Sequence, residues 1–598
     1  MLKLGFSSAN AKIEATCSEN MVRPFSKLRS RFASSVSTGA LTFDVDIDDF
    51  LTNLFELAAW PSDDDVRWQH ELLTLVETNA DDADTIDSRL RGLSPEADEE
   101  QPLLGSRWIA SLTDFQARDV SKLLNLNHGA NFSVPGAGKT RVALATYEGS
   151  RLRRQVERLV VVCPKSAYES WRDEIVLCFG TDAVKVDFWN APSPLAPEVS
   201  LINYERLPDA LSSILHLFHT ARTMLVLDEA HRTKLGSRGA WGSATLAIGP
   251  YAARRLILTG TPAPNGAADI ENLFGFVWPG QGRVRVRSAI ESASLKEASR
   301  RLSPLYTRTT KAELGLPPVS IAVRRLKLPD LHREVYSALL GQFEGARASG
   351  GDLSRFGKVA LYLLMAATTP ALLSVGSSRH EPLVHQVRPL QAPPNSTLNE
   401  LMRDLPAYEM SPKFEEVISI VAKNAALGKK TLVWSTFVRS LTTLRSLLSR
   451  YQPALVHGGT QDREAQLSRF RTDPKCWVLL SNAATLGEGV SLHQVCHDAV
   501  YVDRDFAAGK YLQSLDRIHR LGLSADVETN VTILTADGTI DEVVERRLEI
   551  KLEFMGGLLD DAAVTNLVDL DEEPSEAAGL SRDDLHLLME HLRADAAK

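Results

Sequence analysis

Cysteine is scarce in this sequence, and long apolar runs are lacking. The 598 residues include five cysteines: Cys17, Cys163, Cys178, Cys476 and Cys496. None forms a CxxC pair, which argues against a structural zinc site or a disulfide framework and favours a reducing compartment. No apolar run reaches the roughly 18 residues that span a bilayer, and the first residues contain no continuous apolar signal core. We therefore expect a cytoplasmic protein without a membrane partner.

Positive net charge, the usual sign of a nucleic-acid-binding protein, is also lacking, because the formal net charge is −9. The charge is unevenly distributed, however. Residues 556–598 contain eleven acidic and three basic side chains, whereas residues 283–327 contain eleven arginines and lysines. Since the local field steers a partner more than the bulk charge does, the composition does not exclude nucleic acid.

A length of 598 residues exceeds what one hydrophobic core usually supports, so several domains are expected. Short apolar runs alternate with helical patterns in two series, at 106–280 and at 398–555. Buried parallel strands give continuous apolar runs, and their alternation with helices indicates a doubly wound sheet. The sequence therefore predicts an α/β fold with two tandem parallel-sheet lobes.

Three further segments flank these lobes. Residues 1–105 mix apolar stretches with an acidic run, which predicts a small N-terminal accessory domain followed by a loose linker. Residues 281–397 are predicted to form a helical, basic protrusion and an inter-lobe linker. Residues 556–598 are predicted to form an acidic tail that contains an amphipathic terminal helix.

A glycine-rich segment, SVPGAGKT at 133–140, precedes a helical run in the first lobe. Glycines let backbone N–H groups approach phosphate oxygens, and a helix N-terminus favours negative charge. Lys139 can reach the β- and γ-phosphates, and Thr140 can offer a hydroxyl to Mg²⁺. Ser133 stands where the strict GxxxxGK[ST] pattern has its first glycine. The candidate nucleotide-binding residues are Pro135, Gly136, Ala137, Gly138, Lys139, Thr140 and Arg141.

An acidic pair, Asp228 and Glu229, ends an apolar strand of the same lobe. A carboxylate at a strand end can hold Mg²⁺, and a second one beside it can orient or deprotonate the attacking water. Together with Lys139, the pair predicts nucleotide hydrolysis with ATP and Mg²⁺ as cofactors. Thr140 and Asp228 are the candidate metal ligands.

The order of motifs over roughly 110–555 resembles the superfamily-two helicase-type ATPases, and specifically the Swi/Snf-related DNA translocases. The motifs in the first lobe are LTDFQ (112–116), CPKSAYESWRDE (163–174), INYERL (202–207), DEAH (228–231) and LTGTP (258–262), and YTRTTKAELGLPP (306–318) resembles the family segment that joins this lobe to its helical protrusion. Those in the second lobe are LVWSTF (432–437), SNAATLGEGVSL (481–492) and QSLDRIHRLG (513–522). The last resembles the family's QxxDRxHRxGQ, with Leu523 in place of the final glutamine.

This resemblance implies two RecA-like lobes and further site residues. Gln116 would hydrogen-bond the adenine, and Arg517 and Arg520 would be arginine fingers that stabilise the γ-phosphate when the lobes close. The implied DNA-contacting or coupling residues are Lys165, Ser166, Thr259, Thr261, Thr436, Thr485, Gly487 and Gly489.

The function that the resemblance implies is an ATP-dependent translocase on double-stranded DNA that remodels or displaces DNA-bound complexes. It would bind the DNA backbone without sequence specificity, and a protein partner would supply specificity. The basic segment 283–311 is a candidate for added phosphate contacts. Two alternatives stay open: a strand-separating helicase on RNA or single-stranded DNA, and an ATP-sensing scaffold subunit of a DNA-repair or anti-phage defence complex.

Overall fold

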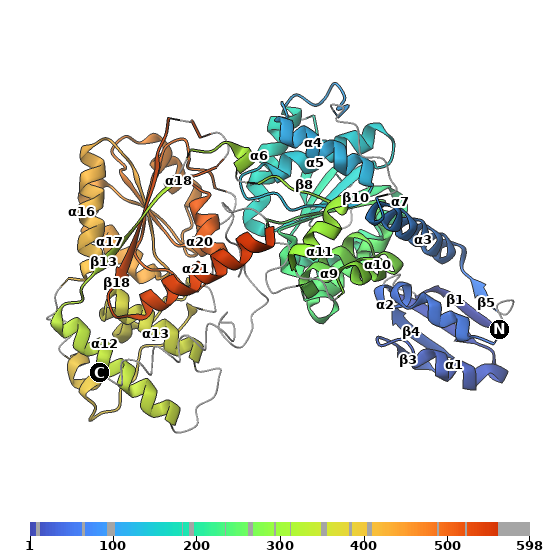
Figure 1. The fold of residues 1–598 in the computed structure, drawn as a ribbon, viewed down its shortest axis with the longest axis horizontal. Helices are drawn as coiled ribbons and strands as arrows, with labels where there is room; N and C mark the ends of the chain where they lie inside the picture. The colour runs from blue at the N-terminus through green and yellow to red at the C-terminus, as the bar shows by residue number, and fades with distance from the viewer. Residues whose placement is uncertain are drawn as a thin grey trace. The chain divides into compact units, whose positions relative to one another are not determined.

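The chain divides into two compact units in the computed structural model, the first formed mainly by Met1–Glu313 and the second mainly by Leu314–Gly557 (Figure 1). The structure describes residues 1–559 except 8–11, 62–65, 93–101, 182, 190–196, 234, 261–266, 292–294, 311, 318, 349–355, 382–384, 404–409, 487–489, 507, 521–522 and 525. Most of the predicted acidic tail therefore lies outside the described residues. Within the described part of the chain, no helix is both long and apolar enough to cross a membrane.

The N-terminal part of the first unit is a small domain built on a five-stranded sheet, in the order β3-β4-β2-β1-β5. The strands are β1 (Leu2–Phe6), β2 (Lys12–Cys17), β3 (Val36–Gly39), β4 (Thr42–Asp46) and β5 (Val66–Trp68). Helices α1 (Val22–Arg29) and α2 (Ile47–Thr52) complete it. Alternate strand residues such as Ile13 and Phe43 are buried in its core, as expected for a sheet with one packed face.

Helix α3 (His70–Leu90) follows this domain and packs on α10 (Gln281–Ile290) of the first lobe. The Asn79 side-chain amide donates to the carbonyl of Pro279, at 2.8 Å. Asp82 pairs with the buried Arg255, at 2.6 Å. These two contacts join α3, the helix that follows the small domain, to the first lobe.

The first lobe contains a seven-stranded parallel sheet in the order β12-β6-β11-β10-β7-β9-β8. Its strands are β6 (Gly129–Asn131), β7 (Arg158–Val162), β8 (Val186–Phe188), β9 (Val199–Ile202), β10 (Thr223–Asp228), β11 (Arg254–Leu258) and β12 (Tyr306–Thr307). The helices named below are α4 (Asp114–Leu126), α5 (Lys139–Leu152), α6 (Tyr168–Phe179) and α9 (Ala267–Val277). Every residue of β10 is buried, so both faces of the sheet are covered.

The second unit contains a six-stranded parallel sheet in the order β13-β18-β17-β14-β16-β15. Its strands are β13 (Val319–Leu326), β14 (Thr431–Trp434), β15 (Ala454–Val456), β16 (Val478–Ser481), β17 (Asp498–Tyr501) and β18 (Thr529–Ala536). Its helices include α12 (Asp330–Ala348), α13 (Phe356–Thr368), α16 (Pro412–Ala426), α17 (Val438–Leu447), α20 (Ala508–Leu515) and α21 (Ile540–Leu559). The predicted α/β fold with two parallel-sheet lobes is confirmed.

The stretch 281–397 differs from the expected helical protrusion in one respect, because it supplies an edge strand to each sheet. Strand β12 joins the first sheet beside β6, and β13 joins the second beside β18. Six of the eight residues of β13 are exposed, and β12 has only two residues. An edge strand of either kind gives no continuous apolar run, so the sequence pattern did not reveal it.

Candidate active site

The glycine-rich segment connects β6 to α5, as a phosphate-binding loop does. Gly136 and Gly138 both adopt positive φ angles, of 81° and 80°, which glycine tolerates at no steric cost. A Cβ on Gly138 would also overlap the amide of Gln116. Gly138 is the N-cap of the fourteen-residue α5, so the loop leads into a helix N-terminus suited to an anion.

Lys139 holds this loop in its present form. Its ammonium donates to the carbonyl of Ser133, at 3.0 Å, and to that of Val134, at 3.4 Å. These acceptors are neutral, and a phosphate oxygen is a stronger, charged acceptor for the same group. Thr140, the next residue, is partly exposed. The loop therefore fits the phosphates of a nucleotide.

Two of the predicted nucleotide contacts are engaged with protein groups. The Gln116 amide donates to the carbonyl of Ala137, at 3.1 Å, and its oxygen accepts the backbone N–H of Thr113, also at 3.1 Å. Arg141 pairs with Glu174 of α6, at 2.6 Å. Gln116 thus supports the loop directly, and its predicted contact with adenine stays a prediction.

The acidic pair lies at the end of β10, on the same edge of the sheet as the phosphate loop that follows β6. The carboxyl ends of parallel strands are where open α/β sheets bind ligands. Asp228 accepts one hydrogen bond from the indole N–H of Trp171, at 2.8 Å, and another from the backbone N–H of Glu229, at 3.0 Å. Tyr204 donates its hydroxyl to the Asp228 carbonyl, at 2.7 Å.

Glu229 has a φ of 51°, in the left-handed region that non-glycine residues rarely occupy. Strain of this kind concentrates at functional sites, where the surroundings must hold it. The imidazole Nδ1 of His231 lies 3.5 Å from a Glu229 carboxylate oxygen and 3.2 Å from the hydroxyl of Thr259. Thr259 follows β11, the strand between β6 and β10. Thr261 lies outside the described residues.

Two supporting residues, Trp171 and Tyr204, were not predicted. Both belong to motifs quoted for the resemblance, but their contacts with Asp228 depend on how three strands meet, and neither motif alone signals this. The residues predicted from the motif that contains Trp171 are Lys165, which is exposed, and Ser166, which is partly exposed. Both follow the end of β7.

The predicted arginines lie in the second unit, just beyond α20. Arg517 is 7% exposed. Its guanidinium donates to the carbonyl of Gln513, at 2.8 Å, and to that of Val490, at 3.0 Å. Arg520 is partly exposed. The structure thus brings the phosphate loop and the acidic pair together in the first unit and the two arginines together in the second.

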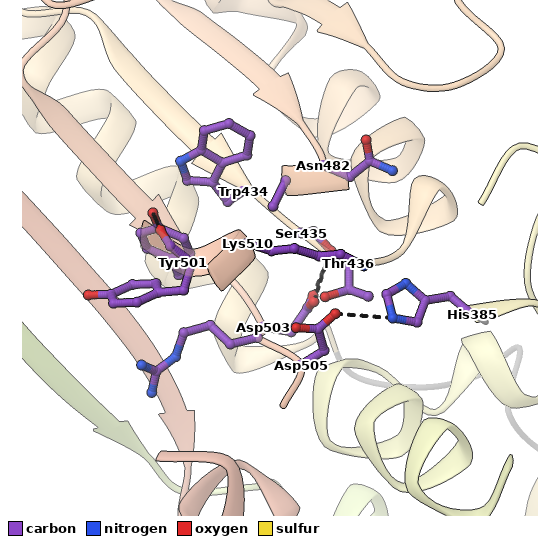
Figure 2. Close-up of a pocket in the computed structure, with 12 residues that line it drawn as sticks. His385, Trp434, Ser435, Thr436, Asn482, Tyr501, Asp503, Asp505 and Lys510 are labelled. Atoms are coloured by element: carbon purple, nitrogen blue, oxygen red, sulfur yellow. Dashed lines mark hydrogen bonds and ion pairs between the residues drawn. The ribbon is translucent and has the colours of Figure 1, made fainter. Parts of the chain in front are cut away.

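A pocket in the second unit lies where β14, β16 and β17 end, and Figure 2 shows its lining. The backbone N–H of Thr436 donates to Asp503, at 2.7 Å, and the Ser435 hydroxyl donates to the same carboxylate, at 2.5 Å. Burial raises the pKa of Asp503, and these hydrogen bonds oppose that rise. Thr485 lies in the short helix after β16. Gly487 and Gly489 lie outside the described residues.

Comparisons with known proteins match both lobes. The SNF2-related domain matches residues 132–367, and the helicase conserved C-terminal domain matches residues 412–522. The human SWI/SNF-related matrix-associated actin-dependent regulator of chromatin subfamily A member 1 is 25% identical over 476 residues, which cover 74% of this chain and 43% of the relative. The chromodomain-helicase-DNA-binding protein 1-like of Danio rerio is 27% identical, with the same two shares.

The chain therefore spans less than half the length of these curated relatives. A solved structure, the Sulfolobus solfataricus SWI2/SNF2 ATPase core in complex with dsDNA, is 18% identical, covers 82% of this chain and 99% of that chain, and has a TM-score of 0.34. The first domain match contains the phosphate loop and the acidic pair, and the second contains the arginine pair. Both lobes thus carry the family's own motifs in the family's order, and the chain belongs to the Swi/Snf-related, helicase-type ATPases of superfamily two.

Proposed function

We propose that this chain hydrolyses ATP in a double-stranded-DNA-stimulated reaction and uses the cycle to move along DNA. The observation that carries the proposal is the division of the hydrolysis residues between two units. Lys139, Asp228 and Glu229 lie in the first, and Arg517 and Arg520 lie in the second. A cationic group that arrives only on closure makes hydrolysis conditional on lobe geometry.

In the first unit, Lys139 exchanges its two carbonyl acceptors for the β- and γ-phosphates, and the loop N–H groups bind the remaining oxygens. Thr140 and Asp228 would hold Mg²⁺, which when bound neutralises charge on those phosphates. Trp171 fixes one Asp228 oxygen, so the carboxylate needs no reorganisation. Glu229 orients the attacking water, and His231 lies beside its carboxylate.

We place the DNA contacts at the strand ends, where Lys165, Ser166, Thr436 and Thr485 lie. Nucleic acid that contacts both lobes favours the closed state and so stimulates hydrolysis. Contacts to the backbone carry no sequence information and weaken with salt.

The basic segment 283–311 is a weaker candidate than its charge suggests. Arg283 and Arg287 both pair with Glu271, and Arg301 pairs with Glu297. Arginines that are already neutralised by neighbours attract phosphate less strongly, so we do not assign them the main DNA contacts.

Displacement of DNA-bound complexes is the use of this motor that the relatives' names favour. One relative is named a SWI/SNF chromatin-remodeling complex subunit, and another a TATA-binding protein-associated factor. Non-specific backbone contacts cannot select a target, so we further propose that a protein partner supplies specificity.

The test measures ATP turnover of the full chain with and without duplex DNA, followed by displacement of a third strand from a triplex. We expect DNA-stimulated turnover that Lys139→Ala abolishes, and triplex displacement without separation of the duplex strands. Separation of the strands would instead support a helicase. Absence of turnover under both conditions would refute the motor and favour the scaffold.

A further inference from the structure

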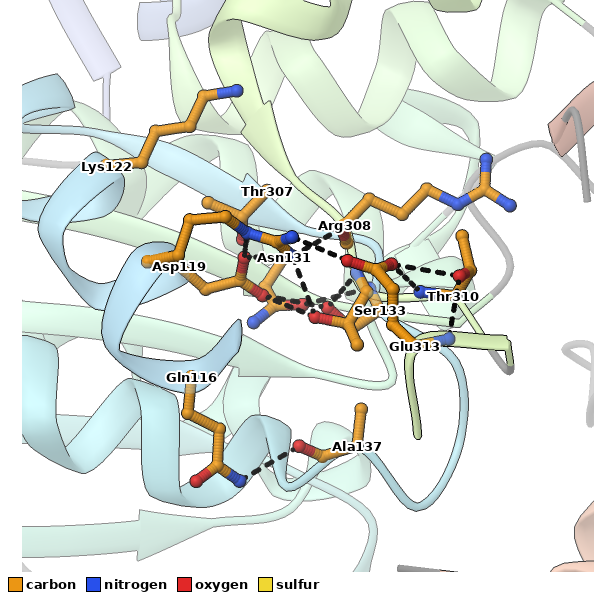
Figure 3. Close-up of polar contacts among 12 residues, drawn as sticks. Gln116, Asp119, Lys122, Asn131, Ser133, Ala137, Thr307, Arg308, Thr310 and Glu313 are labelled. Atoms are coloured by element: carbon orange, nitrogen blue, oxygen red, sulfur yellow. Dashed lines mark hydrogen bonds and ion pairs between the residues drawn. The ribbon is translucent and has the colours of Figure 1, made fainter. Parts of the chain in front are cut away.

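Ser133, which departs from the strict phosphate-loop pattern, uses its side chain in a buried polar cluster (Figure 3). Its hydroxyl donates to the Asp119 carboxylate, at 3.2 Å, and accepts the backbone N–H of Thr309, at 2.9 Å. The Thr309 hydroxyl donates to the same oxygen of Asp119, at 3.0 Å. A glycine at position 133 could make neither side-chain contact.

The cluster is inside the protein: Asp119 is 2% exposed, Ser133 1% and Thr309 0%. The other oxygen of Asp119 accepts two hydrogen bonds from the Arg118 guanidinium, at 3.2 and 3.0 Å. Burial raises the pKa of Asp119, whereas Arg118 and the two hydroxyl groups oppose that rise. A buried carboxylate whose two oxygens are both bonded fixes its partners firmly, because no water can replace them.

Helix α4 thereby holds the phosphate loop at two points. Gln116 and Asp119 are three residues apart and so lie on one helix face. Gln116 reaches the carbonyl of Ala137 near the end of the loop, and Asp119 reaches Ser133 at its start. The carbonyl of Ser133 is also an acceptor for the Lys139 ammonium, so this residue joins the phosphate-binding lysine to the cluster.

The segment that leaves the first unit is the cluster's other partner. The backbone N–H groups of Phe132 and Val134 donate to the carbonyls of Thr307 and Thr309, at 2.8 and 3.1 Å. Four residues later the chain reaches Glu313, the last residue of this part of the first unit. Its carboxylate accepts from Arg118, at 2.5 Å, and from the backbone N–H of Thr310, at 2.7 Å.

We propose that Asp119 is a positioning residue that, through Ser133 and Thr309, joins the state of the phosphate loop to the segment connecting the two units. The proposal rests on the proposed ATPase function. When Lys139 leaves the Ser133 carbonyl for a phosphate, Ser133 loses one of its fixed partners, and its hydroxyl carries the change to Thr309. The connecting segment thereby responds to the nucleotide before any second-lobe residue takes part.

The experiment measures backbone hydrogen exchange in the full chain with and without a non-hydrolysable ATP analogue. In the wild type, nucleotide is expected to slow exchange at the start of α5 and also to change exchange in 305–310 by about tenfold. Ser133→Gly, which restores the strict phosphate-loop pattern, should keep the first effect and reduce the second below about twofold. Ser133→Thr keeps the hydroxyl and should behave as the wild type does.

Asp119→Asn and Thr309→Val should each reproduce Ser133→Gly and should lower DNA stimulation of turnover about tenfold. A double variant with Ser133→Gly and Thr309→Val should be no worse than either single variant, because both substitutions remove the same cluster. Asp114→Asn is the matched control, since Asp114 is an exposed carboxylate on the same helix.

Two results would overturn the inference. One is nucleotide protection of α5 with no change in 305–310 of the wild type, and the other is a Ser133→Gly protein that retains the full response. Both leave the proposed function standing. Absence of any nucleotide effect on the wild type, α5 included, would instead reject the proposed function, and the inference with it. Unfolding temperatures of the variants close to that of the wild type would exclude a general loss of structure.

Discussion

Replacement of Asp82 by asparagine tests whether the N-terminal domain is an integral part of the first lobe. Asp82 lies on α3, and its carboxylate contacts the Arg255 guanidinium at 2.6 Å and the His128 imidazole at 3.2 Å. Burial lowers the pKa of His128 to about 4, so this imidazole is neutral at pH 7 and Arg255 is the cation of the pair. The backbone N–H of Arg255 donates to Nδ1 of His128, which leaves Nε2–H to donate to Asp82.

The expected loss of stability follows from the pKa of the Asp82 carboxylate. Burial alone would raise the pKa of Asp82, but its two partners outweigh burial and lower the pKa from an ordinary 3.8 to about 2. At 1.36 kcal/mol for each pH unit, the lowered pKa sets an upper limit of about 2 kcal/mol at neutral pH, because part of the lowering is the attraction of a charged His128, and this imidazole is neutral there. Asp82→Asn also leaves the Arg255 guanidinium buried without its counter-charge, which raises the expected loss to about 2–4 kcal/mol.

Hydrogen exchange in α3 and α10 is the appropriate assay, because a chain of two units does not unfold in one step. A loss of about 2 kcal/mol corresponds to opening that is roughly 30-fold more frequent. Asp84→Asn, an exposed carboxylate on the same helix, is the control. The stabilisation is fully present above pH 3.8 and is lost as the pH falls towards 2, so the difference between the two variants should shrink on acidification. Equal exchange in both at pH 7 would refute the reasoning.

Four further predictions concern residues of the proposed catalytic site. Glu229→Gln should abolish ATP turnover while nucleotide binding, measured by fluorescence, is retained; full activity would refute its role with water. Trp171→Phe removes the indole donor to Asp228 and should raise the Mg²⁺ concentration for half-maximal turnover about tenfold, a typical effect of a group behind a metal ligand. Arg520→Ala should lower turnover at least about 10³-fold without a change in melting temperature. Arg517→Ala should lower both the turnover and the melting temperature, because the Arg517 side chain also joins two buried carbonyls. An unchanged melting temperature would refute this structural role.

The lobes could be predicted from the sequence because their central strands are covered on both faces. Runs such as β7 and β10 are continuously apolar, and this pattern survives without any tertiary information. The small N-terminal sheet was not predicted, because its mostly antiparallel strands are short and alternate in polarity. The edge strands β12 and β13 were not predicted either, because they too lack a continuous apolar run.

The residues of the candidate active site also divide into those that could be predicted from the sequence and those that could not. The positions of Lys139 and Asp228 at one sheet edge follow from motif order and strand topology, which local patterns reveal. The groups that hold them were not predictable, because each comes from a different part of the chain. Trp171 reaches Asp228 across 57 residues, and Ser133 meets Thr309 across 176. Such contacts leave no periodicity in the sequence.

These distant supports have a consequence for the catalytic cycle. In the proposed cycle the lobes open and close repeatedly, and a lobe can then keep its reacting groups aligned only if they are fixed within that lobe, since preorganised groups cost no reorganisation at the moment of reaction. Asp228 is fixed by Trp171, and the start of the phosphate loop is fixed by Asp119. In the proposed cycle, the step that then controls hydrolysis is the approach of the second lobe. Of the two predicted arginine fingers, Arg517 is already bound to the carbonyls of Gln513 and Val490. For Arg517 to reach a phosphate it must give up these hydrogen bonds, so closure would also release the carbonyls of Gln513 and Val490.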